Sequence, residues 1–254
     1  MKSTTYIIGG SKGMGLETAK RLITRGNPVT LVARGAEGLA KAEKELAALG
    51  DSSVGTIVCD LYDQGQVDKL AASIRDSADP ISGLVNSAGY FAPKPFLEQT
   101  RADYKVYHDL NESLFIITQA VAENMKRNGG GAIVNIGSMW AKQAIKATPS
   151  SSYSMAKAGL HAMTQHLAIE LADSNIRVNA VSPAVVVTTI YKSFIEENQI
   201  ESTLAGFNEF HPIGRVGRPT DVASAIDFLL SDETSWGSGA IWDIDGGVMA
   251  GRNQ

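Results

Sequence analysis

The sequence predicts a single α/β domain, spanning residues 1–254, in which a doubly wound, seven-stranded parallel sheet carries helices on both faces. Short runs rich in Ile and Val alternate along the chain with longer amphipathic segments, as in strand–helix units. Most of the short runs lack the polar–apolar alternation of a sheet with one face in water. The length of 254 residues, with no internal repeat or linker, fits one such domain.

Seven short apolar runs are predicted to be strands. Continuous apolar runs of this length are typical of strands that are buried on both faces. In chain order, the predicted strands are Thr4–Gly9, Val29–Ala33, Gly55–Cys59, Gly83–Asn86, Ala132–Ile136, Arg177–Val181 and Ala240–Ile244.

Six longer segments between these runs repeat apolar residues at helical spacing. Gly26 and Gly50 fit helix ends, and Pro219 fits a helix start. The predicted helices are Gly13–Arg25, Glu37–Leu49, Gln66–Ala78, Arg101–Arg127, Ser151–Ala172 and Thr220–Ser231. The polar stretch Ile190–His211, between the sixth strand and the last helix, is predicted to be a substrate lid.

Composition narrows the class of partner and the location. The net charge of −4 argues against a nucleic-acid partner. The single cysteine, Cys59, rules out an internal disulfide, and the four histidines are dispersed without the clustering of a metal site. The N-terminal residues do not resemble a signal peptide, and no apolar run approaches the roughly 18 residues that span a bilayer. We therefore expect a cytoplasmic protein with no membrane segment and no metal.

A glycine-rich turn follows the first predicted strand and opens the first predicted helix. Glycines at such a point let the chain turn tightly and let a pyrophosphate approach the helix N-terminus. The turn predicts a dinucleotide site, and its candidate contacts are Gly9, Ser11, Lys12, Gly13, Met14 and Gly15.

The end of the second strand predicts which dinucleotide binds. An acidic residue there favours NAD through the ribose 2′-hydroxyl, whereas an arginine accommodates the 2′-phosphate of NADP. The strand ends in Ala33 and Arg34 with no acid, and Lys12 lies in the nearby glycine turn. We therefore expect NADP(H) as cofactor, with Arg34 and Lys12 at its 2′-phosphate.

A tyrosine and a lysine lie one helical turn apart, at Tyr153 and Lys157. Residues at i and i+4 are neighbours on one face of a helix. A nearby cation favours phenolate and lowers the pKa of a tyrosine, whose ordinary value is near 10. The pair therefore predicts a proton-transfer group in which Lys157 lowers the pKa of Tyr153.

Together, the glycine turn, the segment Asn86-Ser87-Ala88-Gly89 and the Tyr153-x-x-x-Lys157 pair resemble the short-chain dehydrogenase/reductase family. The resemblance covers essentially the whole chain and implies a Rossmann-type fold. It also implies further cofactor contacts in three places: directly after the third strand, at the end of the fourth strand and just after it, and in the loop after the sixth strand. These contacts are Asp60, Leu61, Asn86, Ala88, Gly89, Pro183, Ala184, Val186 and Thr188, together with Tyr153 and Lys157. Ala184 stands where the family usually has glycine.

The resemblance also implies a catalytic set of Asn111, Ser138, Tyr153 and Lys157. Tyr153 is the general acid in reduction and the base in oxidation, and Ser138 holds the substrate oxygen. Lys157 also contacts the nicotinamide ribose, and Asn111 holds a water that connects Lys157 to solvent. Gly137 replaces a serine that is common in the family.

The implied function is an NADPH-dependent oxidoreductase that transfers a hydride between the nicotinamide and a carbonyl or secondary alcohol of a small molecule. Two alternatives stay open: a 3-oxoacyl-carrier-protein reductase of the same family, and a non-catalytic NADP(H)-binding regulator or scaffold. The family usually forms homotetramers, or dimers, through its fourth and fifth helices and its C-terminal strand. On that basis we expect the same here, with His161 at the interface. Trp140 is the best candidate among the tryptophans for the substrate pocket.

Overall fold

The computed structural model describes residues 3–251, in which seven parallel strands form one sheet in the order β3-β2-β1-β4-β5-β6-β7. The strands are β1 (Thr4–Ile8), β2 (Val29–Ala33), β3 (Val54–Val58), β4 (Ile81–Asn86), β5 (Gly131–Ile136), β6 (Ile176–Pro183) and β7 (Ile241–Ile244). After β3 the chain returns to the middle of the sheet, so that β4 pairs with β1. The strand order therefore reverses between β1 and β4, where open α/β sheets bind their ligands.

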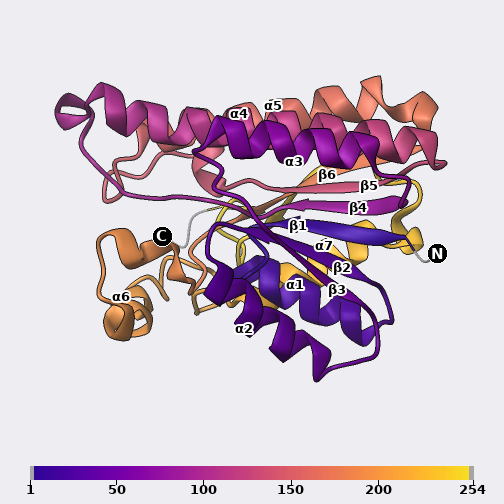
Figure 1. The fold of residues 1–254 in the computed structure, drawn as a ribbon. Coiled ribbons are helices and arrows are strands. Elements are labelled where there is room, and N and C mark those ends of the chain that lie inside the picture. The colour runs from indigo at the N-terminus through magenta and orange to yellow at the C-terminus, as the bar shows by residue number, and fades with distance from the viewer. Residues whose placement is uncertain (1–2, 252–254) are drawn as a thin grey trace.

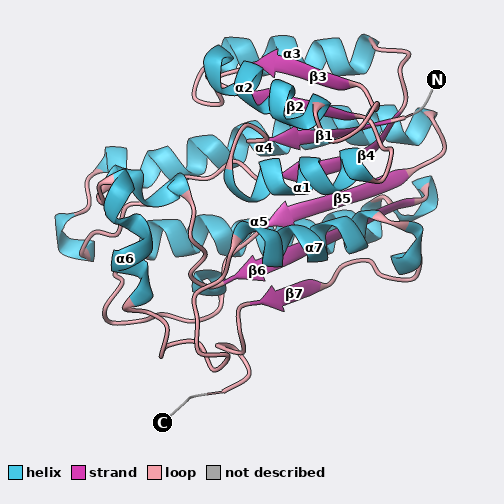
Figure 2. Cartoon of the chain, turned by 90° about the horizontal axis from the view of Figure 1, so that it is seen from below, coloured by secondary structure: helices cyan, strands magenta, loops and turns pink. Residues whose placement is uncertain are grey.

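Helices cover both faces of the sheet, as predicted (Figure 1). One face carries α1 (Gly13–Thr24), α2 (Ala36–Ala47) and α7 (Pro219–Leu230), and the other carries α3 (Gln64–Asp76), α4 (Arg101–Arg127) and α5 (Ser151–Glu170). Figure 2 shows all strands pointing toward the end of the sheet beyond which the short α6 (Ile200–Ala205) lies. No helix within residues 3–251 is long and apolar enough to cross a membrane.

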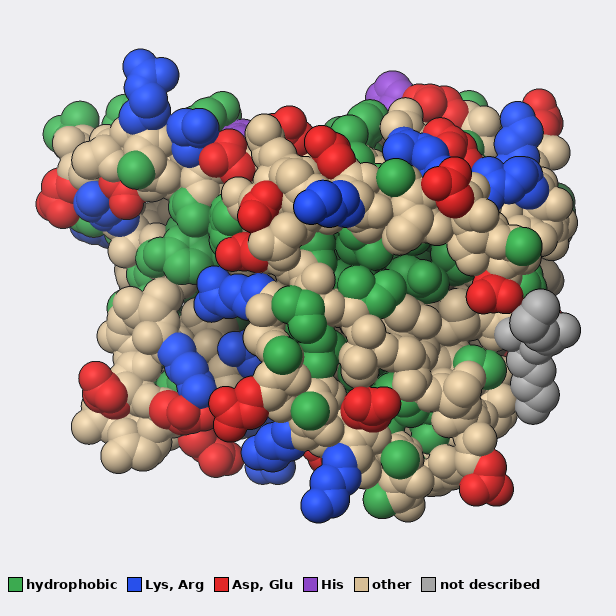
Figure 3. Space-filling view, viewed as in Figure 1, with side chains coloured by type: hydrophobic (Ala, Val, Ile, Leu, Met, Phe, Trp, Pro, Cys, Tyr) green, Lys and Arg blue, Asp and Glu red, His purple; other side chains and the backbone are tan. Residues whose placement is uncertain are grey.

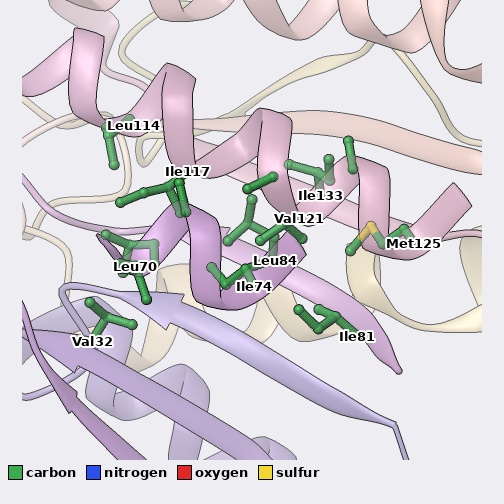
Figure 4. Packing of buried hydrophobic residues seen from close by; sticks show 14 of the residues in the cluster. Val32, Leu70, Ile74, Ile81, Leu84, Leu114, Ile117, Val121, Met125 and Ile133 are labelled. Carbon is green, nitrogen blue, oxygen red and sulfur yellow. The ribbon is translucent and has the colours of Figure 1, made fainter. Parts of the chain in front are cut away.

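Two apolar cores hold the helices to the sheet. On one face, Leu70 and Ile74 of α3 and Ile117 of α4 pack over Leu84 of β4 and Ile133 of β5 (Figure 4). On the other face, α1, α2 and α7 bury their apolar sides against β1, β2, β4 and β5. Burying one such side chain contributes about 1.5–3 kcal/mol, so the interior strands and the carboxyl ends that they present are held firmly.

The structure differs from the predicted pattern at the two edges of the sheet and in the lid. Val58 of β3 is 54% exposed and Trp242 of β7 is 37% exposed, because an edge strand has a partner on one side only. The predicted lid is formed by a 3₁₀ turn at Thr189–Ser193, a second at Glu197–Gln199, and α6. Its buried side chains, including Tyr191 and Leu204, pack into an aromatic-rich cluster that also contains Tyr153.

Candidate active site

The turn after β1 packs directly against the segment that follows β4. Gly9 has a φ of +84°, and a Cβ added there would lie 2.7 Å from the backbone nitrogen of Ala88. A Cβ on Gly15 would lie 2.6 Å from the carbonyl oxygen of Gly9. The Ser87 N–H also donates to the Ile8 carbonyl at 2.8 Å. Glycine is required at both positions because a Cβ would collide with backbone atoms, those of Ala88 at Gly9 and those of the turn itself at Gly15.

The N-terminus of α1 fits the pyrophosphate of a dinucleotide. The helix begins at Gly13 without a side-chain cap and without an acid in its first turn. Its N-terminal N–H groups and the positive end of its dipole therefore favour an anion. A Cβ on Gly13 would meet nothing closer than the Thr188 methyl group, at 3.7 Å. By contrast, α4 begins with a complete capping box formed by Thr100 and Asp103.

Cations gather beside this helix end. Lys12 immediately precedes α1, and Arg34 follows β2. Burial lowers the pKa of Lys12, and the neighbouring charges of Lys192 and Arg34 lower it further. Burial also raises the pKa of Tyr62 to about 12, while the Arg34 charge opposes that rise. The sequence analysis identified Lys12 and Arg34 but missed Tyr62 and Lys192, since only the folded chain brings them together.

Asp60 and Leu61 fix the loop that follows β3. The Asp60 carboxylate accepts the Tyr62 N–H at 3.1 Å, and the Asp60 N–H donates to the Gln66 side chain at 2.9 Å. The Leu61 carbonyl accepts a hydrogen bond from Ser113 of α4. The loop is therefore held against both α3 and α4.

Asn86 lies beneath the site and not on its surface, which differs from its predicted role as a cofactor contact. The side chain is 1% exposed, and its amide donates to Thr118 at 2.9 Å and to Asn135 at 2.8 Å. Asn135 in turn donates to Thr164 of α5 at 2.9 Å. This buried chain of amides joins β4 and β5 to α4 and α5, so Asn86 positions Ala88 and Gly89, which do line the cavity.

Ser138, Tyr153 and Lys157 line one narrow cavity of about 60 Å³. Ser138 follows β5, is 3% exposed, and accepts the Trp140 N–H at 3.3 Å. Tyr153 lies in the first turn of α5, where its ring packs edge-on against Phe91 with the ring centres 4.8 Å apart. The cavity therefore collects three of the four predicted catalytic residues, and Trp140 lines it as well.

The electrostatics of the tyrosine differ from the prediction. Burial raises the pKa of Tyr153 to about 12, although a hydrogen bond with Ser138 opposes the rise. The Lys157 ammonium lies 5.9 Å from the centre of the Tyr153 ring and donates to the Ile136 carbonyl at 2.6 Å. Burial lowers the pKa of Lys157 itself to about 8. The net direction is thus opposite to the expected one, because desolvation outweighs the stabilisation of the phenolate by the Lys157 ammonium, which is bonded to the Ile136 carbonyl.

Asn111 reaches α5 but does not line the cavity. Its side-chain amide donates to the Ala156 carbonyl of α5 at 2.7 Å. It faces the groove between α4 and α5, where Gly159 leaves room for it. Asn111 therefore fixes the turn of α5 that carries Lys157.

The end of β6 at Pro183 and the loop after it form another wall of the cavity, through Pro183, Ala184, Val186 and Thr188. Val186 forms an isolated bridge with Gly217, and the Val187 N–H donates to the Gly217 carbonyl at 3.0 Å. Within residues 3–251, Asn175 is the only non-glycine residue with a positive φ. Ala184 therefore stands in the place of a glycine without backbone strain.

Two aromatic residues that the sequence analysis did not identify complete the cavity. Phe91 comes from the connection after β4 and Tyr191 from the lid, with their ring centres 6.1 Å apart. Ser193 of the lid also donates to the Phe91 carbonyl. No periodicity predicts this contact, because the two segments are distant in the sequence.

Doubly wound sheets bind dinucleotides where their strand order reverses, and the side chains that we predicted to be catalytic lie next to that point here. The class of protein is therefore a nicotinamide-dependent oxidoreductase. Residues 9–249 match the family profile described as enoyl-(acyl carrier protein) reductase. The chain belongs to the short-chain dehydrogenase/reductase family, whose members act on alcohols and carbonyls.

Relatives with different substrates resemble the chain over nearly its whole length. It is 34% identical to the 7alpha-hydroxysteroid dehydrogenase of Escherichia coli (strain K12), covering 97% of this chain and 94% of the relative. It is 33% identical to the galactitol 2-dehydrogenase (L-tagatose-forming) of Cereibacter sphaeroides, covering 95% and 92%. The structure of L-sorbose reductase from Gluconobacter frateurii, complexed with NADPH and L-sorbose, matches with a TM-score of 0.90 at 26% identity, covering 98% and 97%.

Proposed function

We propose that this protein is an NADPH-dependent carbonyl reductase, and in reverse a dehydrogenase of secondary alcohols, with Tyr153 as its general acid and base. The observation that carries the proposal is the single cavity lined by Ser138, Tyr153 and Lys157. The same cavity is lined by Met14 of the glycine turn and by Thr188 of the loop after β6. The proposed proton donor Tyr153, the hydroxyl of Ser138 and the glycine turn therefore border the same cavity.

The side chains have separate tasks in this reaction. The bound cofactor supplies the hydride. In reduction, the Tyr153 hydroxyl gives its proton to the carbonyl oxygen, and the Ser138 hydroxyl stabilises the negative charge that develops there. The protonated Lys157 stabilises the phenolate that is left on Tyr153. In oxidation, the phenolate removes the proton from the alcohol.

The cations beside α1 support a preference for NADPH over NADH. Arg34 follows β2 at the position where NAD-dependent proteins carry an acid, and Lys12 faces it. An arginine at this point accommodates the 2′-phosphate.

The cavity walls favour an apolar or cyclic carbonyl compound, because Phe91, Trp140 and Tyr191 present aromatic surface beside Tyr153.

A 3-oxoacyl-carrier-protein reductase is the second candidate. The chain is 30% identical to one such enzyme, MabA of Mycobacterium tuberculosis (strain ATCC 25618 / H37Rv), over 98% of its length. The lid makes this candidate weaker: Lys192 is its one basic residue besides His211, alongside the acids Glu196, Glu197, Glu201 and Glu209. These charges give little attraction for an acidic carrier protein.

The test is NADPH consumption across a panel of oxo-steroids, cyclic diketones, ketoses and acetoacetyl thioesters, with NADH in parallel. We expect turnover of one compound class with NADPH, and loss of turnover in Tyr153→Phe. Tyr104→Phe, on the exposed surface of α4, is the matched control and should retain wild-type rates. NADPH binding without turnover of any compound would instead favour a non-catalytic regulator or scaffold.

A further inference from the structure

The lid begins on top of the glycine turn. The methyl group of Thr188 lies 3.7 Å from the Cβ position of Gly13, and a side-chain carbon of Ile190 lies 3.3 Å from that of Gly89. The 3₁₀ turn Thr189–Ser193 therefore crosses the place where the turn after β1 meets the segment after β4. A charge carried by this 3₁₀ turn therefore lies close to the dinucleotide site.

Lys192 is the cation that this turn carries. Its ammonium pairs with Glu197 at 2.5 Å, and the two side chains are 39% and 68% exposed. The charges of Lys192 and Arg34 both act on Lys12, and Glu197 opposes them. Three cations from three separate segments thus lie close enough for the charges of Lys192 and Arg34 to act on Lys12. On the side drawn in Figure 3, Lys and Arg side chains gather around a hollow in the surface near α6.

Like charges held this close repel one another, whereas an anion placed between them is attracted by all three. Glu197 neutralises Lys192 only partly, because an exposed ion pair contributes little. The phosphates of a dinucleotide carry more negative charge than one carboxylate. The arrangement therefore favours a ligand with clustered phosphate charge over the internal ion pair.

We propose that Lys192 is a phosphate ligand supplied by the lid, which exchanges Glu197 for a phosphate of the dinucleotide and so closes the lid over the bound cofactor. The inference rests on the proposed function, because it takes a dinucleotide to be the ligand. Lys192 and Glu197 should therefore have opposite effects on the affinity for the dinucleotide. Lys192 contributes to binding, and Glu197 competes with the phosphate for Lys192.

The experiment is a fluorescence titration of the full-length protein with NADPH and with NADH. We expect Lys192→Gln to raise the Kd for NADPH about tenfold, the loss of one charge-assisted contact. Glu197→Gln should lower the Kd about threefold, because it frees Lys192. Lys192→Arg should retain most of the affinity. The difference between wild type and Lys192→Gln should shrink between about 0.05 M and about 0.5 M salt.

The control is Lys105→Gln on α4. Lys105 is exposed, its ammonium lies 3.8 Å from the Asp109 carboxylate, and neither residue lines the cavity. A loss confined to NADPH places Lys192 at the 2′-phosphate, and an equal loss for NADH places it at the diphosphate. Wild-type affinity in Lys192→Gln, or weaker binding in Glu197→Gln, would overturn the inference while the proposed function stands. If wild type binds neither dinucleotide, both fail. Thermal unfolding of each variant shows that the fold is intact.

Discussion

At the scale of single residues, Gly137 lies directly against the buried imidazole of His161. A Cβ added to Gly137 would lie 2.0 Å from the His161 Nε2. His161 is 8% exposed, and its Nε2 has no hydrogen-bond partner within residues 3–251. Burial lowers its pKa to about 4, helped by the charges of Lys142 and Lys157. His161 is thus a neutral residue that packs within its own chain behind the loop of Ser138, and the interface role expected from the sequence stays a prediction.

This packing predicts a coupled pair of substitutions. Gly137→Ala forces a methyl group onto the imidazole, and overpacking of this kind costs about 1–3 kcal/mol of unfolding free energy. Because Ser138 is the next residue, kcat should fall as well. In a His161→Ala background the same change should cost much less. Urea unfolding of the wild type, the two single variants and the double variant measures these costs. Simple additivity of the two substitutions would contradict the predicted contact.

The pKa of Lys157 predicts the pH dependence of reduction. Its value of about 8 means that Lys157 is charged below pH 8 and neutral above it. We expect kcat/KM for reduction to be level below that pH and to fall above it, because the cation that stabilises the Tyr153 phenolate is lost. The pKa of Tyr153, about 12, lies too high to limit the profile.

Initial rates from about pH 6 to about pH 10 test this profile, and Lys157→Arg is the informative variant. A guanidinium stays charged throughout that range, so the fall near pH 8 should disappear in any Lys157→Arg protein that retains activity. If the fall persists in that variant, another group is titrating.

At the scale of elements, His211 ties the end of the lid to the loop after β6. Its Nε2 accepts the Val185 N–H at 3.3 Å, so its Nδ1 carries the proton and donates to the Phe207 carbonyl at 2.7 Å. The imidazole is 2% exposed. The lid is therefore anchored at one end by His211 and at the other by Thr188, whose hydroxyl caps the first 3₁₀ turn.

Removing this anchor should loosen the lid without unfolding the sheet. In His211→Ala the buried Val185 N–H loses its acceptor, at a cost of about 1–3 kcal/mol. We expect faster hydrogen exchange at residues 189–210 and a several-fold higher KM, with exchange in the inner strands unchanged. His211→Gln retains an acceptor and should restore part of the protection. Unchanged exchange in His211→Ala would show that the lid is held elsewhere.

At the scale of the whole molecule, large apolar side chains are exposed among charged ones on the outer surface of α4 and α5. Phe115, Met155 and Ile169 are 49%, 55% and 80% exposed, and a groove of about 770 Å³ runs between the two helices. At the β7 edge, Trp236 is fully exposed and Ile213 is 63% exposed. Exposed large apolar side chains on different sides of one chain are consistent with a molecule that binds further copies of itself.

We expect a homotetramer, or a dimer, and light scattering should report a multiple of 26.9 kDa. Ala162, exposed in the groove of α5, offers a selective test, because a charge in a closed helix interface is costly. Ala162→Glu should reduce the particle mass, whereas Ala47→Glu, on the exposed side of α2, should not. A wild-type mass of 26.9 kDa would rule out the oligomer.

The cytoplasmic location stays a prediction from the sequence.

Local rules determined the parts of this molecule that the sequence predicted well. The bounds of α4 match the prediction at both ends, because Thr100 and Asp103 cap its start through contacts within four residues. The glycine turn and the i,i+4 pair of Tyr153 and Lys157 are likewise short-range patterns. They indicated the dinucleotide turn and the proton-transfer pair before any fold was known.

What the tertiary structure alone decided depends on residues that are distant in the sequence. Burial set the direction of the Tyr153 pKa, and desolvation depends on Phe91, Tyr107 and the lid, not on the neighbouring lysine. The contacts of His161 with Gly137, and the convergence of Lys192 on Lys12, likewise join separate elements. The sequence by itself determined the order of the strands and helices along the chain and identified Ser138, Tyr153 and Lys157, which line one cavity, because periodicity and short motifs are local. The charge states, the lid contacts and the packing could be known only from the fold, because each depends on several residues that are distant in the sequence and that folding brings together.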